Sequence, residues 1–352
     1  MTNQLATIDQ AAELDQLDKG AALTVGQAAN RAAAAWAFAD YRGRKSANTL
    51  RNHDAALGLF GRFLMESGAA DFADLDGAAL ASDPAAWHGV TWGIVEAWRV
   101  AMLAAGYSVG TINNRLSAIR VYAGLASKAG AIPADELTMI KAVAGYGVTE
   151  GKRINERRPR SRVGPKKSAA VGLTLDQARR LKAPADNSGQ AARDAFIMTL
   201  LLDHGLRVGE LAALEVEALN LDAGMLIFYR PKVDMTQSHR LTAAALTAAR
   251  RYLANRPPIA GGLWVASDRR GGLLPRPMSG RAISKRVELL GAGVGAVGLS
   301  PHDCRHYWAT NAANSGTGVF SLRDAGGWSS VAMPARYVEA AAVANEGVML
   351  TQ

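Results

Sequence analysis

The chain has 352 residues, and this length predicts two domains, because one domain usually contains about 100 to 200 residues. A hydrophobic fraction of 49% with 20% charged residues excludes an intrinsically disordered chain. Forty Lys and Arg against 31 Asp and Glu give a net charge of +9, which favours a polyanionic partner over a scattered basic surface.

The cysteine content and the N-terminal residues indicate the compartment. Cys304 is the only cysteine, so the chain can form neither an intrachain disulfide nor a multi-thiolate metal site. The first residues, MTNQLATIDQAAELDQLDKG, are polar and acidic, and no stretch approaches about 18 apolar residues. We therefore expect a cytoplasmic protein that is not secreted and does not span a membrane.

A helical domain is expected at residues 29–146, after an N-terminal tail at 1–28. Apolar side chains recur at the helical intervals of three and four in two runs: Leu57, Phe60 and Leu64, then Ile112, Leu116 and Ile119. Ser108 is a suitable N-cap for the second run, and Gly130 is a suitable stop. Residues 92–103 predict another helix, and no strand-like alternation interrupts the pattern.

A basic segment at residues 147–172 predicts an interdomain linker, because it combines Pro and Gly with few large apolar residues. It is either a solvated tether or a strap against DNA phosphates, where each contact releases counterions. We favour the strap. The expected DNA-binding residues are Arg157, Arg158, Arg160, Arg162, Lys166 and Lys167.

Residues 173–352 predict a second, mostly helical domain, with Thr174 as the cap of its first helix. Two short strands are expected at 225–229 and 237–241, joined by a turn near 233–236, and helix returns after them to the end of the chain. The predicted fold class is thus mainly α, with one small antiparallel sheet in the second domain.

Four patches of the second domain carry candidate chemistry. They are HGLRVGELAAL with Arg207 and Glu210, YRPKVDMTQSHRL with Lys232, SPHDCRHYWAT with His302 and Arg305, and AGGWSSVAMPARYVE with Trp328 and Tyr337. Their order resembles the active-site signature of the tyrosine recombinase, or phage integrase, family, and the resemblance covers roughly residues 29–350. It implies a SAM-like helical core-binding domain at 29–146 and a tyrosine recombinase catalytic domain at 173–352.

The residue types suit attack on a DNA phosphodiester without a metal ion. Fixed cations are needed where charge accumulates in the transition state, and the planar arginine side chain donates two parallel hydrogen bonds to phosphate oxygens. We therefore expect Arg207 and Arg305 to clamp the phosphate. His302 and Trp328 are expected to add N–H donors.

The resemblance makes Tyr337 the nucleophile. A phenol with a pKa of about 10 needs a base or a cationic pocket to react at neutral pH. The leaving 5′-oxygen needs a proton, which we expect Lys232 on the predicted hairpin to supply, with Lys285 and Arg240 as alternatives. The carboxylates expected to orient the arginines are Glu210 or Asp303.

The resemblance also implies how DNA is handled. The first step leaves a 3′-phosphotyrosyl link and a free 5′-hydroxyl, and strands exchange through a Holliday junction between two specific double-stranded DNA sites held by four protomers. No cofactor and no metal are implied, and the location is expected to be nucleoid-associated. The segment 338–352 is expected to dock on a neighbouring protomer, and Trp328, where many relatives have His, is reminiscent of Cre-like members.

Two alternative functions fit a similar residue set. One is a type IB topoisomerase, which relaxes supercoils without exchanging partners. The other is a catalytically silent DNA-binding relative.

Two features of the sequence resemble other kinds of site. Gly293, Gly295 and Gly298 form a GxGxxG string, but a predicted helix at 279–290 precedes it where a dinucleotide site needs a strand. We expect a loop there. Cys304 is expected to pack in the core and not to act as a nucleophile.

Overall fold

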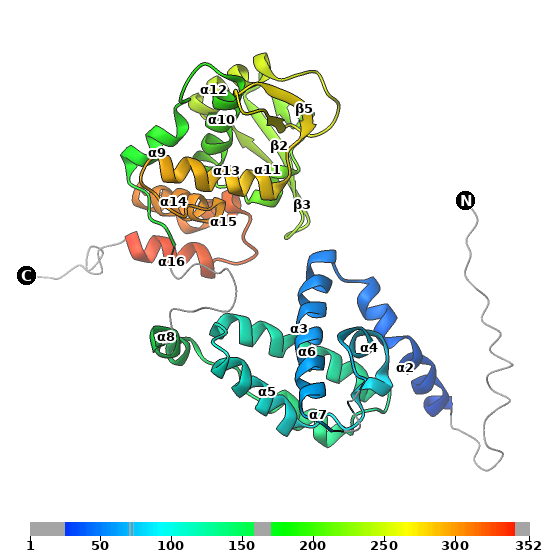
Figure 1. Cartoon of the computed structure of the whole chain (residues 1–352). Helices are drawn as coiled ribbons and strands as arrows, with labels where there is room; N and C mark the ends of the chain where they lie inside the picture. Colours follow the sequence, from blue (N-terminus) through cyan, green and yellow to red (C-terminus); the bar gives the residue numbers. More distant parts are fainter. Residues whose placement is uncertain (1–24, 70–71, 73, 158–169, 342–352) are drawn as a thin grey trace, which may run out of the picture. The chain divides into compact units, whose positions relative to one another are not determined.

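The computed structural model describes residues 25–69, 72, 74–157 and 170–341, and Figure 1 shows their helices and strands. The chain divides into two compact units, Met1–Lys166 and Lys167–Gln352. The division falls inside the segment predicted to be a linker.

The first unit is helical throughout its described part. Its elements are α2 (Val25–Gly43), α3 (Ala47–Glu66), α4 (Gly77–Ser82), the 3-10 turn η2 (Pro84–Trp87), α5 (Trp92–Ala104), α6 (Val109–Lys128), α7 (Ala134–Ala142) and α8 (Val148–Arg157). The helix expected at 92–103 is therefore present as α5. Ser108 caps α6, since its hydroxyl accepts a hydrogen bond from the backbone N–H of Thr111, and Gly130 follows the C-cap in the left-handed region.

The core of the first unit lies between α3 and α6, which run side by side (Figure 1). The two periodic runs expected to face inward are buried on these helices. Phe60 packs edge-on against Trp98, with ring centroids 5.0 Å apart, and also contacts Trp87. The helical period of the sequence thus identified the core of this unit.

Helix α8 differs from the sequence-based expectation. It occupies 148–157, the first part of the predicted linker, and Ile154 packs against the core of the first unit. Gly151 allows α8 to lie close to α6, because a Cβ atom at this position would lie 2.9 Å from the side chain of Val109. Arg157 is the last residue of α8, and the other five expected DNA-binding residues lie outside the described part of the chain.

The second unit combines helices with short strands. Its helical elements are α9 (Leu175–Lys182), α10 (Gly189–Asp203), α11 (Val208–Ala212), the 3-10 turn η3 (Val216–Ala218), α12 (Ala243–Asn255), α13 (Gly280–Gly293), α14 (Pro301–Asn314), α15 (Val319–Gly326) and α16 (Ala332–Ala341). Helix α10 is buried along most of its length and is flanked by α9, α12 and α14. Thr174 caps α9, as expected.

Two antiparallel sheets are present where one was expected. The first has the order β1 (Leu219–Asn220), β2 (Met225–Arg230) and β3 (Met235–Arg240), so both predicted strands exist and the turn between them lies slightly earlier, at 231–234. The second pairs β4 (Val265–Ser267) with β5 (Leu273–Pro277). The expectation of helix after the first sheet was wrong here, because these strands are too short and irregular for a pattern of period two.

The GxGxxG string and Cys304 do not form the sites that they resemble in sequence. The GxGxxG string begins at Gly293, the last residue of helix α13, and Gly295 and Gly298 adopt positive φ angles in the connection to α14. Cys304 is buried in the core of the second unit.

No helix in the described ranges is long and apolar enough to cross a membrane.

Candidate active site

Glu210 joins two arginines at the base of the site. On one side its carboxylate accepts hydrogen bonds from the backbone N–H of Arg207 at 2.8 Å and from Nη1 of the same residue at 2.7 Å. On the other side it accepts from Nη1 of Arg230 at 2.9 Å. Glu210 and Arg230 are almost fully buried, so their charges are stable only as a pair.

The C-terminal turn of α15 collects three guanidinium groups. The carbonyl oxygen of Gly327 accepts from Arg207 at 3.1 Å, and that of Gly326 accepts from Arg230 at 3.0 Å and from Arg305 at 2.6 Å. Arg230 also donates to the carbonyl of Ala325 at 2.8 Å. These contacts form because the last carbonyls of a helix lack intrahelical partners and carry a partial negative charge.

Positions 326 and 327 of this turn have no room for a side chain. A Cβ atom at position 326 would lie 1.9 Å from the ring of Trp328, and one at 327 would lie 2.5 Å from the side chain of Arg230. Gly327 also has φ +59°, in the left-handed region that favours glycine. The two glycines before Trp328 therefore allow the ring of Trp328 and the side chain of Arg230 to approach the backbone.

Arg305 is held between a carbonyl and two indole rings. Its Nη1 donates to the carbonyl of Gly205 at 2.5 Å, and its guanidinium carbon lies 4.3 Å from the ring centroid of Trp328 and 5.8 Å from that of Trp308. Burial, followed by the charges of Arg207 and Arg230, lowers the pKa of Arg305 to about 9. The group remains cationic at neutral pH.

Tyr337, on α16, faces the same cluster. Its ring centroid lies 6.1 Å from that of Trp328, and its hydroxyl lies 2.6 Å from Nδ1 of His306 on α14. Nε2 of His306 lies 3.0 Å from Nε2 of His302, one helical turn earlier. Five of the six expected catalytic residues thus lie in one network of contacts, in which the carbonyls of the α15 turn link Arg207 to Arg305 and His306 links His302 to Tyr337.

Lys232 is the sixth, and it lies in the exposed turn between β2 and β3. No hydrogen bond or ion pair joins its side chain to another described residue. The alternatives lie elsewhere: Lys285 is exposed on α13, and Arg240 ends β3. The turn that carries Lys232 directly follows Arg230, so the hairpin begins in the site.

The two expected supporting carboxylates are placed differently. Glu210 contacts arginines, as described above. Asp303 accepts from the backbone N–H and the hydroxyl of Ser300 at 2.7 and 2.6 Å and from the backbone N–H of Val171 at 3.1 Å. It thus completes the N-terminal cap of α14 and connects the start of the second unit to that helix.

Sequence reasoning missed three residues of the site: Arg230, Gln237 and His306. Arg230 is fully buried, and Gln237 accepts a hydrogen bond from its Nε at 2.5 Å and donates to the carbonyl of Asp324. An Arg that ends a strand after a continuous apolar run resembles a solvated strand end, so the sequence carried no clear signal for Arg230. His306 directly follows Arg305 in the patch SPHDCRHYWAT, so its position beside a candidate arginine was a signal in the sequence.

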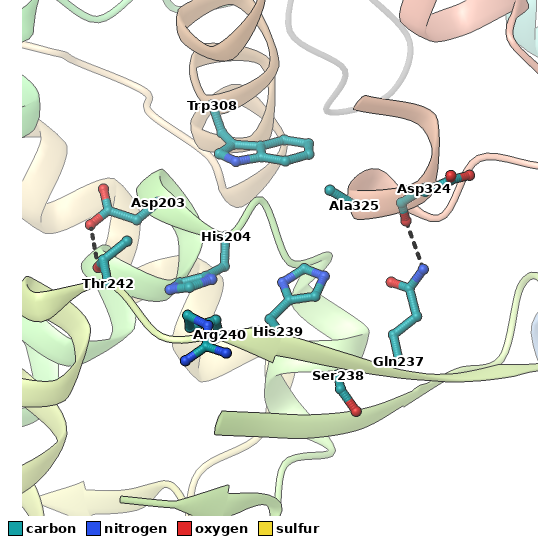
Figure 2. Close-up of a pocket in the computed structure, with 10 residues that line it drawn as sticks. All are labelled: Asp203, His204, Gln237, Ser238, His239, Arg240, Thr242, Trp308, Asp324 and Ala325. Carbon is teal, nitrogen blue, oxygen red and sulfur yellow. Dashed lines mark hydrogen bonds between the residues drawn. The ribbon is translucent and has the colours of Figure 1, made fainter. Parts of the chain in front are cut away.

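A cavity of about 460 Å³ lies beside the arginine cluster, along β3 (Figure 2). Figure 2 shows His204 and His239 next to each other on its floor and Trp308 on the opposite side. The two imidazole centroids are 5.8 Å apart, and each Nε2 atom is buried without a hydrogen-bond partner among the described residues. Burial is the main cause that lowers the pKa of both rings, that of His239 to about 4, so both are neutral.

The described part of the chain contains no group of three or more His, Cys, Asp or Glu side chains arranged to hold a metal ion.

Comparison with known proteins identifies relatives of both units. The model of the phage integrase family matches residues 172–343. The tyrosine recombinase XerA of Pyrococcus furiosus is 28% identical over 229 residues, which cover 64% of this chain and 76% of the relative. The tyrosine recombinase XerC of Mycobacterium sp. (strain KMS) is 25% identical over 259 residues, 70% of this chain and 78% of the relative.

Solved structures share the fold. The Tn1549 transposon integrase in complex with transposon right end DNA has a TM-score of 0.59 at 17% identity and covers 86% of this chain and 94% of its own. A lambda integrase dimer bound to a core site has a TM-score of 0.56 at 14% identity, with 90% and 95% covered. The relatives favour a recombinase over a topoisomerase. Together with the ordered residues, these matches identify residues 172–343 as a phage integrase family domain, and the relatives of the chain are tyrosine recombinases, enzymes that cleave and rejoin DNA.

Proposed function

We propose that this protein is a site-specific DNA recombinase in which Tyr337 attacks a phosphate held by Arg207 and Arg305. The observation that carries the proposal is the turn at the end of α15. Its successive carbonyls hold both guanidinium groups, and Trp328 directly after it contacts Arg305 and Tyr337. The turn thus brings the two cations and the phenol to one place.

The arginines provide a preorganised site for negative charge. Each guanidinium has five N–H donors, so donors not used for the carbonyls and Glu210 remain for phosphate oxygens. Because protein groups already fix the cations, little reorganisation is needed when charge develops on the phosphate. The ring nitrogens of His302 and Trp328 supply further donors in this proposal.

Lys232 is proposed to protonate the leaving 5′-oxygen. Its support is its place in the turn between β2 and β3, immediately after Arg230. An exposed lysine on a turn can approach a bound strand, whereas Lys285 on α13 is fixed to a rigid helix. The products are then a 3′-phosphotyrosyl link and a free 5′-hydroxyl, as the family resemblance implies.

On the larger scale, we propose that four protomers hold two specific DNA sites and exchange strands through a Holliday junction. We propose that the basic residues at 157–167 contact DNA phosphates. Similar solved structures, a transposon integrase in complex with transposon right end DNA and a lambda integrase dimer bound to a core site, support a DNA partner, which we propose is double-stranded. A nucleoid-associated location follows from the same partner.

The test is a covalent complex on DNA. Duplexes that bind the full-length protein are first selected from a random-sequence library, and each is then nicked just 3′ of a candidate phosphate so that rejoining fails. We expect an adduct that resists SDS and disappears in Tyr337→Phe, while Tyr229→Phe, an exposed tyrosine on β2, forms it normally. Peptide mapping identifies the linked residue and the scissile phosphate. An adduct that persists in Tyr337→Phe would contradict the nucleophile assignment.

A further inference from the structure

The nucleophile's hydroxyl contacts a histidine that the family signature does not assign. Nδ1 of His306 lies 2.6 Å from the Tyr337 oxygen, and the two ring centroids are 5.6 Å apart. The contact joins α14 to α16, which pack against each other. Within the described ranges, this is the hydrogen bond that the Tyr337 hydroxyl makes.

A second histidine completes a chain of hydrogen bonds. Nε2 of His306 lies 3.0 Å from Nε2 of His302, and the rings meet edge to face with centroids 4.4 Å apart. One of these nitrogens must carry the hydrogen. If Tyr337 donates to Nδ1 of His306, the remaining hydrogen of that neutral ring is on Nε2 and is donated to His302.

The surroundings of Tyr337 favour the neutral phenol. Burial raises the pKa of Tyr337, and the opposing effect of Arg305 is smaller, so the phenol is a weaker acid here than in water. Burial, and after it His306, lowers the pKa of His302, which is neutral at pH 7. A base close to the Tyr337 hydroxyl would offset this effect of burial.

We propose that His306 is a catalytic residue, the base that accepts the Tyr337 proton, and that His302 supports it by accepting the hydrogen bond from its Nε2. This inference rests on the proposed function, because it requires Tyr337 to be the nucleophile. The same arrangement leaves the hydrogen of His302 on Nδ1, where it can be donated to a phosphate oxygen.

The step balances without any additional reagent. A lone pair of the Tyr337 oxygen forms the new O–P bond, and the phenolic proton moves to Nδ1 of His306. The P–O5′ bond breaks with its electron pair on the 5′-oxygen, which takes a proton from a separate donor, Lys232 in the proposed function. On rejoining, the 5′-hydroxyl attacks phosphorus and gives its proton to Lys232, the bond between phosphorus and the Tyr337 oxygen breaks, and His306 returns its proton to Tyr337.

The charged and titratable groups around this chain are few. Tyr337 faces His306 from α16, and His302 faces it from the preceding turn of α14. Besides His306, the charged groups that shift the pKa of His302 or Tyr337 are Arg305, Asp303 and Arg207.

The test measures the rate of adduct formation on the nicked duplex whose scissile phosphate was mapped with the wild-type protein. His306→Asn keeps an oxygen that accepts the Tyr337 hydrogen bond but is not basic, and His306→Ala leaves space for added imidazole. We expect both to be about 100- to 10,000-fold slower at pH 7, with a defect that shrinks as pH rises and the phenol ionises without help. Imidazole should restore His306→Ala in part. Asn311→Ala, exposed on the same helix, is the matched control.

A second substrate distinguishes the loss of the base, His306, from the loss of the acid, Lys232. When sulfur replaces the bridging 5′-oxygen, the leaving thiolate needs no proton. We expect this duplex to restore the rate of Lys232→Ala, while His306→Asn stays slow.

The outcomes distinguish the two proposals. If the wild-type protein forms no Tyr337 adduct on any selected duplex, the proposed function fails. If it does, and His306→Asn matches its rate and pH profile, Tyr337 is the nucleophile and the inference about His306 is wrong. A His306→Asn variant whose slow rate is independent of pH, and which the 5′-sulfur restores, would also overturn it. Circular dichroism and binding of the same duplex confirm that each variant is folded.

Discussion

The charge of Glu210 is central to the arginine cluster. This buried carboxylate accepts hydrogen bonds from Arg207 and Arg230, and its negative charge also raises the pKa of Arg305. Burial lowers the pKa of Arg230, and Glu210 opposes that shift. Without the carboxylate, the buried guanidinium would be an uncompensated charge.

Glu210→Gln should therefore destabilise the second unit. Breaking a buried ion pair typically costs about 3–5 kcal/mol, and glutamine keeps the shape but not the charge. We expect faster hydrogen–deuterium exchange in α11 and β2, measured by mass spectrometry, with α3 and α6 of the first unit unchanged. Glu217→Gln, exposed in η3, is the control and should have little effect. Identical exchange in Glu210→Gln and the wild type would refute the role of this charge.

At the scale of elements, β3 and the end of α10 bring two neutral histidines together in the cavity of Figure 2. The pKa of His239 is lowered to about 4 by burial, then by His204 and Arg230, and that of His204 is lowered by burial. An unfolded chain has histidines with a pKa of about 6.5. Between these values the unfolded state binds more protons than the folded state.

The second unit should consequently lose stability as pH falls from about 6.5 to 4, and not above this window. For His239 the loss is at most about 3 kcal/mol, since one pKa unit corresponds to about 1.36 kcal/mol. We expect His239→Gln to flatten this dependence in urea unfolding read by hydrogen exchange of α10. His88→Gln, exposed in the first unit, should leave it unchanged. An equally steep pH dependence in His239→Gln would show that other groups cause it.

At the scale of the whole molecule, the proposed tetramer requires contacts between protomers. Residues 342–352 lie outside the described part of the chain, and their sequence includes Val343, Val348, Met349 and Leu350. A short apolar segment that docks head to tail on a neighbour can close a ring of protomers.

Truncation after Ala340 is expected to abolish the joining of two DNA sites and to spare binding of a single site. Native gels with two duplexes of different length measure both properties, because a synaptic complex contains both labels. Deletion of residues 2–20 is the control for loss of a terminal segment. Two-site complexes that form normally in the truncated protein would refute the coupling.

The sequence predicted much of the fold because its signals are local. The period of three and four identified the cores of α3 and α6, and Ser108 and Thr174 marked helix starts by their capping hydroxyls. Strands β4 and β5 were missed because short strands depend on their partners more than on their own pattern. Helix α8 was predicted to be linker because its packing depends on the close approach of Gly151 to Val109, which is a tertiary contact.

For the active site, the sequence by itself determined the family and the order of its residues, since residue type and order are written in the chain. Only the tertiary structure decided which groups meet. Arg230 enters the cluster because β2 ends beside Glu210, and His306 meets Tyr337 because α14 packs on α16. These contacts join residues far apart in sequence, and a buried charge or a shared proton depends on distances that no local pattern encodes.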